Sequence, residues 1–187
     1  ADDEAVIRMG LKQMVTALGH RVLATAANGD QALKIAQTHP LDLLLLDIKM
    51  PGRNGLAVAE TLSATRPMPI IMLTAFSERA LIERAAHASV MGYLVKPIHE
   101  SKLGPAIELA VSRFAAMQET ARQVHQLRER LEVREVVDAA KQILMAGGLS
   151  EAEAYRRLQM TARERRCSMR QVARAVIAVG QQVPDKS

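Results

Sequence analysis

Five polar side chains of this chain have the types and positions that phosphate chemistry needs. Asp47 ends the most apolar run of the sequence, five leucines interrupted by one aspartate. Such a run predicts a strand buried on both faces, which is typical of parallel sheets in α/β proteins. Thr74 and Lys96 each follow another short aliphatic run, and the acidic pair Asp2-Asp3 stands at the start. Because open α/β sheets bind ligands at the carboxyl ends of their strands, we expect these side chains to share one crevice.

This set of groups suits the transfer of a phosphoryl group onto a carboxylate. Converging carboxylates bind a hard cation such as Mg²⁺, which also takes phosphate oxygens as ligands. One carboxylate then attacks phosphorus and forms an aspartyl-phosphate. A lysine neutralises the charge on the transferring group, and a threonine hydroxyl donates a hydrogen bond to it. Each residue alone reads as readily as a cap, a turn or a surface residue, so their joint placement carries the prediction.

Residues 1–112 resemble the receiver domain of two-component response regulators. The matching residues are Asp2-Asp3, Asp47 with Met50-Pro51 and Gly55, Thr74-Ala75, Tyr93, and Lys96-Pro97. The resemblance implies that Asp47 is the phosphoacceptor, assisted by Thr74 and Lys96, and that a sensor histidine kinase is the partner. The Mg²⁺ ligands would be Asp2, Asp3, Asp47 and the backbone carbonyl of Lys49. Thr74 and Tyr93 would be the switch pair that rearranges on phosphorylation.

The expected fold of this part is α/β, a flavodoxin-like doubly wound parallel sheet. Strand and helix patterns alternate, which places helices on both faces of the sheet. Strands are expected at 21–26, 41–46, 69–73 and 91–95, and helices at 5–18, 29–38, 55–65, 77–87 and from 102 onward. In the family order 2-1-3-4-5 the first strand lies inside the sheet and ends at the acidic pair. We therefore expect about 6 to 15 residues that form this strand to precede Ala1.

A long helix is predicted after the receiver-like part. From Pro105 to Met145 no further glycine or proline interrupts a strongly helix-forming stretch, whose length points to a coiled coil or a signalling linker. Apolar residues with near-heptad spacing are Met117, Ala121, Val124, Leu127 and Leu131. The repeat is short and imperfect. We expect residues 113–133 to form a helical linker or coiled coil and to support a homodimer, at least on phosphorylation; the alternative is a single helix packed on its own domains.

Two shorter amphipathic helices are expected to follow. Gly147-Gly148 ends the long helix, and Ser150 with Glu153 predicts a capping box. The expected buried residues are Ala154, Leu158 and Ala162 in the next helix and Met169, Val172, Ala173, Val176 and Ile177 in the last, which Ser168 opens. Since such helices bury little alone, they should close on the long helix as an all-α three-helix bundle over 134–180, followed by a tail at 181–187.

Basic residues gather in this last part of the chain. The net charge is +5, and residues 139–187 hold nine Lys or Arg against four Asp or Glu. A small bundle with an arginine-rich face is typical of nucleic-acid binding, although a solvated surface is the alternative. The candidate contact residues are Lys141, Arg156, Arg157, Arg163, Arg166, Arg170 and Arg174.

Residues 134–180 also resemble the ANTAR RNA-binding domain of transcription antiterminators. The shared pattern is Ala140-Lys141, Leu144-Met145, Glu151, Ala154-Tyr155, Leu158, Ala162 and Val172-Ala173. The chain departs from it at Arg163, where many members have methionine. The resemblance implies binding to RNA hairpins in nascent transcripts. The four aromatic residues of the whole chain argue separately against a reader that stacks bases on an aromatic platform.

Together these features predict a phosphorylation-regulated response regulator that binds RNA hairpins and acts as a transcription antiterminator, and not an enzyme. We expect a cytoplasmic protein without a membrane partner, because its one cysteine, Cys167, excludes an internal disulfide and no apolar stretch approaches a membrane span. One alternative is a receiver with a DNA-binding helical output, although in the last two helices Gln171 is the one amide-bearing residue near a helix start. The other is a protein-interaction adaptor or phosphate sink.

Overall fold

The computed structural model describes residues 1–75 and 89–180. The helix expected at 77–87, Phe76 and the tail at 181–187 lie outside the described residues. The chain divides into two compact units, Ala1–Glu119 and Thr120–Ser187. Among the described residues, no helix combines the length and apolar character that crossing a bilayer requires.

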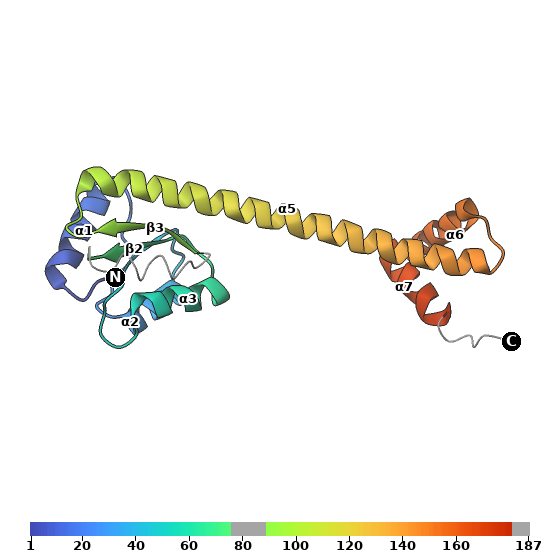
Figure 1. The fold of residues 1–187 in the computed structure, drawn as a ribbon, viewed down its shortest axis with the longest axis horizontal. Helices are drawn as coiled ribbons and strands as arrows, with labels where there is room; N and C mark the ends of the chain where they lie inside the picture. The colour runs from blue at the N-terminus through green and yellow to red at the C-terminus, as the bar shows by residue number, and fades with distance from the viewer. Residues whose placement is uncertain (76–88, 181–187) are drawn as a thin grey trace. The chain divides into compact units, whose positions relative to one another are not determined.

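A parallel sheet forms the centre of the first unit (Figure 1). Its strands are β1 (Leu44–Asp47), β2 (Ile70–Thr74) and β3 (Val90–Val95), in the order β1-β2-β3. Both neighbouring pairs run parallel. All five residues of β2 are buried, as expected for a central strand covered on both faces. The predicted α/β architecture with a parallel sheet is thereby confirmed.

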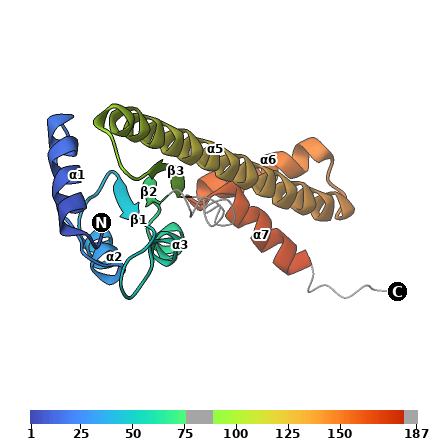
Figure 2. The ribbon, with the colours of Figure 1, turned by 60° about the vertical axis from the view of Figure 1, so that its left-hand side comes forward.

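Helices cover both faces of this sheet (Figure 2). They are α1 (Ala5–Ala17), α2 (Gly29–Thr38), α3 (Gly55–Thr65) and the first part of α5 (Glu100–Ala146). Ile70 and Met72 of β2 pack in one core with α2 and α3, whereas Ile71 and Leu73 pack in a second core with α1 and α5. Alternate residues of a strand point to opposite faces of the sheet, so successive residues of β2 pack in different cores.

The segment 21–26 does not form the expected strand. Ala1 and Asp2 lie between it and β1: the Asp2 N–H donates to the Ala26 carbonyl at 3.1 Å, and the Asp47 N–H donates to the Ala1 carbonyl at 2.9 Å. Beyond these two residues, a cavity of about 310 Å³ separates the segment from residues 40–45. A strand needs ladder bonds along its length, and two residues supply too few. The prediction of a strand at 21–26 was wrong for this reason.

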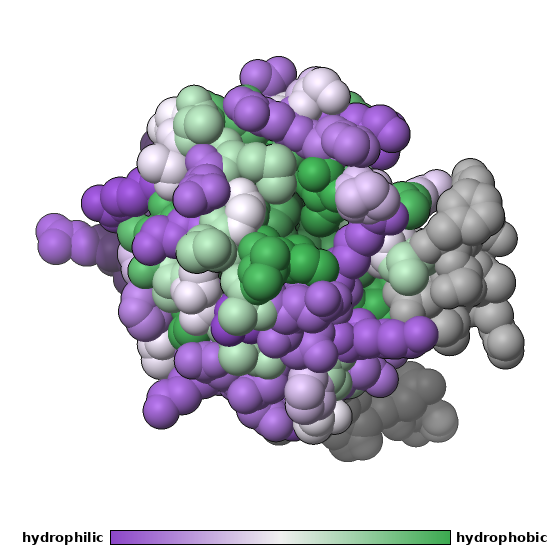
Figure 3. All heavy atoms as spheres, turned by 90° about the vertical axis from the view of Figure 1, so that its left-hand side faces the viewer, coloured by the Kyte–Doolittle hydropathy of each residue, from purple (hydrophilic) through white to green (hydrophobic). Residues whose placement is uncertain are grey.

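The exposed surface mixes polar and apolar side chains. The face in Figure 3 is mostly hydrophilic, with hydrophobic residues gathered toward its middle. Large apolar residues with high exposure in the first unit include Val6 and Met9 on α1. Scattered exposed apolar residues of this kind are normal on soluble domains and do not by themselves mark a site.

The second unit is a helical bundle made of the end of α5, α6 (Glu151–Glu164) and α7 (Met169–Gly180). Its buried core consists of Val137, Ala140, Leu158, Ala162, Val172 and Ala173. Gly148 has a φ of +99°, a left-handed conformation that glycine adopts without steric cost, and it turns the chain at the end of α5. The predicted long helix and three-helix bundle are confirmed.

Reciprocal hydrogen bonds cap both short helices at their N-termini. Ser150 and Glu153 form the predicted capping box of α6. At α7 the Ser168 N–H donates to Oε1 of Gln171 at 2.9 Å, and the Gln171 N–H donates back to Oγ of Ser168 at 3.3 Å. The Gln171 amide, which the DNA-binding alternative needs, is therefore engaged within its own helix end.

Candidate functional site

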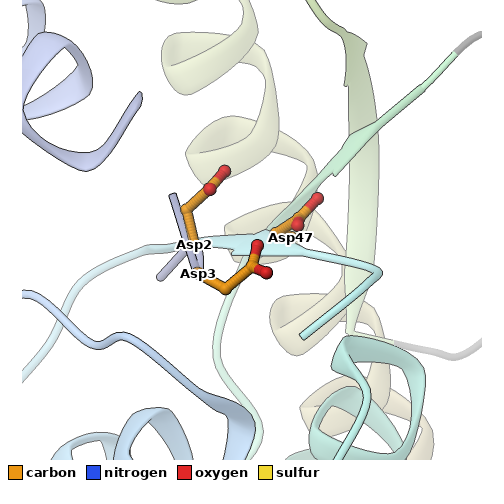
Figure 4. Close-up of side chains that lie close together, drawn as sticks. All are labelled: Asp2, Asp3 and Asp47. Carbon is orange, nitrogen blue, oxygen red and sulfur yellow. The ribbon is translucent and has the colours of Figure 1, made fainter. Parts of the chain in front are cut away.

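Three carboxylates converge at the carboxyl end of β1 (Figure 4). One oxygen from each of Asp2, Asp3 and Asp47 lies within 4.8 Å of the others. Asp2 and Asp47 are buried, and Asp3 is exposed. Buried like charges at this separation repel one another unless cations balance them. The cluster that the sequence predicts therefore exists, and it requires neutralisation.

Backbone hydrogen bonds and Arg8 hold the acidic pair in place. The Glu4 N–H donates to Oδ1 of Asp2 at 3.0 Å. Nη1 of Arg8 donates to the carbonyl oxygens of Asp2 at 2.7 Å and of Asp3 at 2.9 Å. Arg8 was not among the site residues predicted from the sequence. A basic residue in the first helix after the acidic pair was the available signal.

Lys96 supplies positive charge to the buried carboxylates. Its Nζ lies 2.8 Å from Oδ2 of Asp2 and 3.0 Å from Oδ1 of Asp47. Burial lowers the pKa of Lys96, but its contacts with the two carboxylates outweigh burial and raise the pKa above its ordinary value. Burial also raises the pKa of Asp47, and Lys96 opposes this rise. The structure thus brings together Lys96 and the three acids, as predicted.

Thr74 and Tyr93 lie on one face of the sheet at neighbouring strands. In the parallel register Tyr93 pairs with Met72, and Val95 pairs with Thr74. Paired residues of adjacent strands point to the same side, and so do residues two apart on one strand, such as Met72 and Thr74. The two predicted switch residues, Thr74 and Tyr93, therefore share a face of the sheet. Thr74 is buried and its Oγ1 donates to the Ala75 carbonyl at 2.9 Å, whereas Tyr93 is 44% exposed. Their role as a switch pair stays a prediction.

A hollow opens beside the acidic cluster. It has a volume of about 390 Å³ and is lined by Asp3, Ile48, Lys49, Met50, Pro51, Asn54 and Leu56. Lys49 stands between two buried residues in the loop after β1, and its side chain is exposed. Asp3 and the loop with Lys49 line the same hollow, so the Lys49 carbonyl and the Asp3 carboxylate lie on one side of the cluster, as two ligands of one cation would.

The donor set fits a magnesium ion. Mg²⁺ prefers oxygen ligands and binds through one or two carboxylates together with waters and phosphate oxygens. Oδ2 of Asp2 is buried and accepts no hydrogen bond of good geometry, although it forms the ion pair with Lys96. Because this oxygen is already paired with the Lys96 ammonium, the fit rests on the converging oxygens of Asp2, Asp3 and Asp47.

Gly55 lets α3 approach the backbone of the central aspartate. A Cβ at Gly55 would lie 2.0 Å from the carbonyl oxygen of Asp47. We expect Gly55→Ala to lower the free energy of unfolding by about 1–3 kcal/mol, because the Asp47 backbone must move, and to slow phosphorylation as well. Thermal unfolding and phosphoryl incorporation measure the two effects.

Gly10→Ala is the matched control for this prediction. Gly10 lies inside α1, and a Cβ there would meet nothing within 4 Å. The same substitution should therefore raise the free energy of unfolding by about 0.5–1 kcal/mol through helix propensity. Equal stability of the Gly55→Ala variant and the wild type would contradict the steric argument.

The structure divides the seven candidate nucleic-acid-binding residues into two groups. Arg156, Arg157, Arg163 and Arg166 are exposed on α6 and on the turn after it. Lys141 lies 2.9 Å from Asp138 and 2.8 Å from Glu151, and these carboxylates raise its pKa. Arg170 and Arg174 both pair with Glu132. The first group is available to a ligand as the structure stands, and the second is engaged in ion pairs.

The parallel sheet with three carboxylates at its carboxyl edge is the arrangement of a receiver domain, and a helical unit follows it. The family profile of the response regulator receiver domain matches residues 1–108, and that of the ANTAR domain matches residues 125–177. The chain belongs to the response regulators that combine a receiver with an ANTAR domain. Both resemblances seen in the sequence are thereby confirmed, and both domains are of regulatory types.

Among its relatives is the transcriptional regulatory protein PdtaR of Mycobacterium tuberculosis, which is 44% identical over 178 residues, 95% of this chain and 87% of the relative. Solved structures of receiver domains are also similar to this chain. The signal receiver domain of a modulated diguanylate cyclase from Desulfovibrio desulfuricans has a TM-score of 0.57 and 29% identity, covering 62% of this chain and 93% of that one. The receiver domain of the sensor histidine kinase PA1611 from Pseudomonas aeruginosa has a TM-score of 0.54 and 28% identity, covering 60% and 93%. Its structure has a magnesium ion coordinated in the active site cleft.

Proposed function

We propose that this response regulator is phosphorylated on Asp47, binds RNA hairpins in nascent transcripts and acts there as a transcription antiterminator. The observation that carries the proposal is the buried Asp47 carboxylate, held beside Asp2 and Lys96 in a chain whose other unit is a basic ANTAR domain. The similarity to PdtaR over 95% of the chain supports a role in transcriptional regulation. The phosphodonor would be a sensor histidine kinase, and the location the cytoplasm.

The proposed chemistry is a displacement at phosphorus. A carboxylate oxygen of Asp47 forms a bond to phosphorus as the bond to the donor breaks, either P–N in a phosphohistidine or P–O in acetyl phosphate, and the electron pair leaves with the donor. Asp2, Asp3, Asp47 and the Lys49 carbonyl would hold Mg²⁺, which supplies charge neutralisation at the phosphoryl oxygens. Lys96 would pair with the phosphoryl group, and the Thr74 hydroxyl would donate to it once it is attached.

The proposed RNA surface is formed by the exposed arginines of α6 and the turn that follows. Arg156 and Arg163 are seven residues apart and lie away from the buried Leu158. Arg166 has a φ of +50°, a left-handed conformation that costs a residue with a Cβ about 1–2 kcal/mol. Glycine would avoid this cost, and strained residues often mark functional sites. These observations favour a ligand-binding role for the Arg166 side chain.

Two other functions receive less support. A DNA-binding output would need Gln171 at the start of a recognition helix, and that amide caps α7. An adaptor or phosphate sink would leave the exposed arginines of α6 without a role.

A direct binding comparison separates the three functions. Stem-loop RNAs with randomised loops and duplex DNA of equal length are each titrated with the unphosphorylated and the phosphorylated protein. We expect salt-dependent binding to a subset of the RNAs that changes on phosphorylation. Tighter binding to DNA, or binding to neither, would overturn the proposal.

We further propose that α5 mediates a homodimer, at least in the phosphorylated protein. Leu127 and Leu131 are 56% and 59% exposed, so a second copy could bury them. Replacing both by glutamate should oppose dimerisation by placing charge in the apolar seam, without harming the fold of the monomer. Sedimentation velocity of the wild type and of this double variant, each with and without phosphorylation, measures the monomer–dimer equilibrium. An unchanged profile in all four samples would place the coupling within a single chain.

A further inference from the structure

Two arginines of α7 share one carboxylate of α5. Arg170 and Arg174 stand one helical turn apart, and each directs an Nη2 group to Oε1 of Glu132. The bond from Arg174 is 2.9 Å long. All three residues lie in the second unit, within the ANTAR match. The cluster carries two positive charges against one negative charge.

One carboxylate oxygen cannot accept hydrogen bonds from most N–H groups of the two guanidiniums. A guanidinium offers five N–H groups in a planar fork, and here two guanidiniums meet at one oxygen atom. Nε of Arg170 is buried and has no hydrogen-bond partner among the described residues. The side chains of Arg170 and Arg174 remain 31% and 59% exposed, so solvent and solutes can reach the fork.

We propose that Arg170 and Arg174 form a phosphate-binding fork that Glu132 holds in the free protein and that an RNA backbone phosphate takes over on binding. The inference rests on the proposed RNA-binding function. A phosphodiester carries one negative charge on two free oxygens, so each guanidinium gains an acceptor of its own. In the free protein, Glu132 keeps the two arginine side chains close together. The RNA phosphate must displace Glu132 in order to bind them.

The apolar core, and not this ion pair, docks α7. Val172 and Ala173 are buried against Val137 and Ala140 of α5 in the core of the bundle. Loss of the Glu132 charge should therefore leave α7 in place. Glutamine at this position would also keep an oxygen acceptor for one arginine while removing the charge that competes with phosphate.

Glu132→Gln tests the inference, with Glu135→Gln as the matched control. Glu135 lies three residues further along α5, is exposed, and forms no ion pair among the described residues. Both variants add the same net charge. The probe is a stem-loop RNA from the randomised-loop pool that the wild type binds. We expect Glu132→Gln to bind it about three- to tenfold more tightly, since breaking partly exposed ion pairs costs a factor of a few each, and Glu135→Gln to change affinity less than about twofold.

The double variant Arg170→Gln with Arg174→Gln completes the cycle. In that background Glu132→Gln should no longer increase affinity, because no fork remains to be released. Circular dichroism of each protein checks that the helices persist. If wild type binds RNA and Glu132→Gln binds equally or more weakly, Glu132 is a structural staple and the inference is overturned. If no stem-loop RNA binds to wild type or to Glu132→Gln, the proposed function fails first.

Discussion

We expect Asp47→Asn to abolish the incorporation of a phosphoryl group from acetyl phosphate in the presence of Mg²⁺. An amide oxygen is a far weaker nucleophile than a carboxylate, so no acyl phosphate forms at this position. Asn has nearly the same size as Asp and can still contact Lys96, which lies 3.0 Å from Oδ1 of Asp47. The loss should therefore be chemical rather than structural, and intact-mass measurement of the treated protein detects it.

Asp42→Asn provides the control for this expectation. Asp42 interrupts the same leucine run but is exposed. Its replacement removes one carboxylate without touching the acidic cluster, so phosphorylation should continue at the wild-type rate. Labelling of the Asp47→Asn protein at wild-type stoichiometry would refute the assignment of Asp47 as the phosphoacceptor.

We expect Arg156→Ala combined with Arg163→Ala to weaken binding to a stem-loop RNA by about tenfold or more. Hydrogen bonds to charged groups contribute about 1.5–3 kcal/mol each, and both side chains are exposed outside the core of the bundle. If both contact phosphates of a single-stranded loop, the slope of log affinity against log salt should fall by about 1.4. Fluorescence anisotropy at several salt concentrations measures both quantities.

The matched control removes two positive charges from the other unit. Arg21 and Arg113 are exposed residues of the first unit, so Arg21→Ala with Arg113→Ala changes the net charge equally without altering the proposed RNA surface. Helical circular dichroism should stay intact in both double variants. Equal losses of affinity in the two proteins would mean that net charge, rather than a surface on α6, attracts the RNA.

The site could be predicted from sequence because strand ends are easy to locate. The leucine run before Asp47 and the aliphatic runs before Thr74 and Lys96 end where β1, β2 and β3 end, and parallel strands place those ends at one edge. The segment 21–26 has a comparable local pattern, but among the described residues no strand pairs with it. That this segment does not form the predicted strand shows that strand formation depends on the pairing partner as much as on the segment's own residues.

Contacts between distant residues were not predictable in the same way. Glu132 meets Arg174 across 42 residues of sequence, and only the folded bundle reveals that charge is shared there. The contact of Gly55 with the Asp47 carbonyl is likewise a matter of backbone approach, which residue types alone do not encode. The Gln171 cap, in contrast, was available in the sequence, because Ser168 stands three residues before a glutamine.

The two capped helix starts have a consequence for how this protein can hold an anion. Free N–H groups and the positive end of the dipole often make a helix N-terminus a phosphate site. At α6 the Glu153 carboxylate already lies there and bonds to the Ser150 N–H, so a phosphate would meet a negative charge. At α7 the Gln171 side chain accepts the Ser168 N–H. Backbone capture of phosphate is thereby disfavoured at both positions, so the RNA contacts proposed for this unit fall to its side chains.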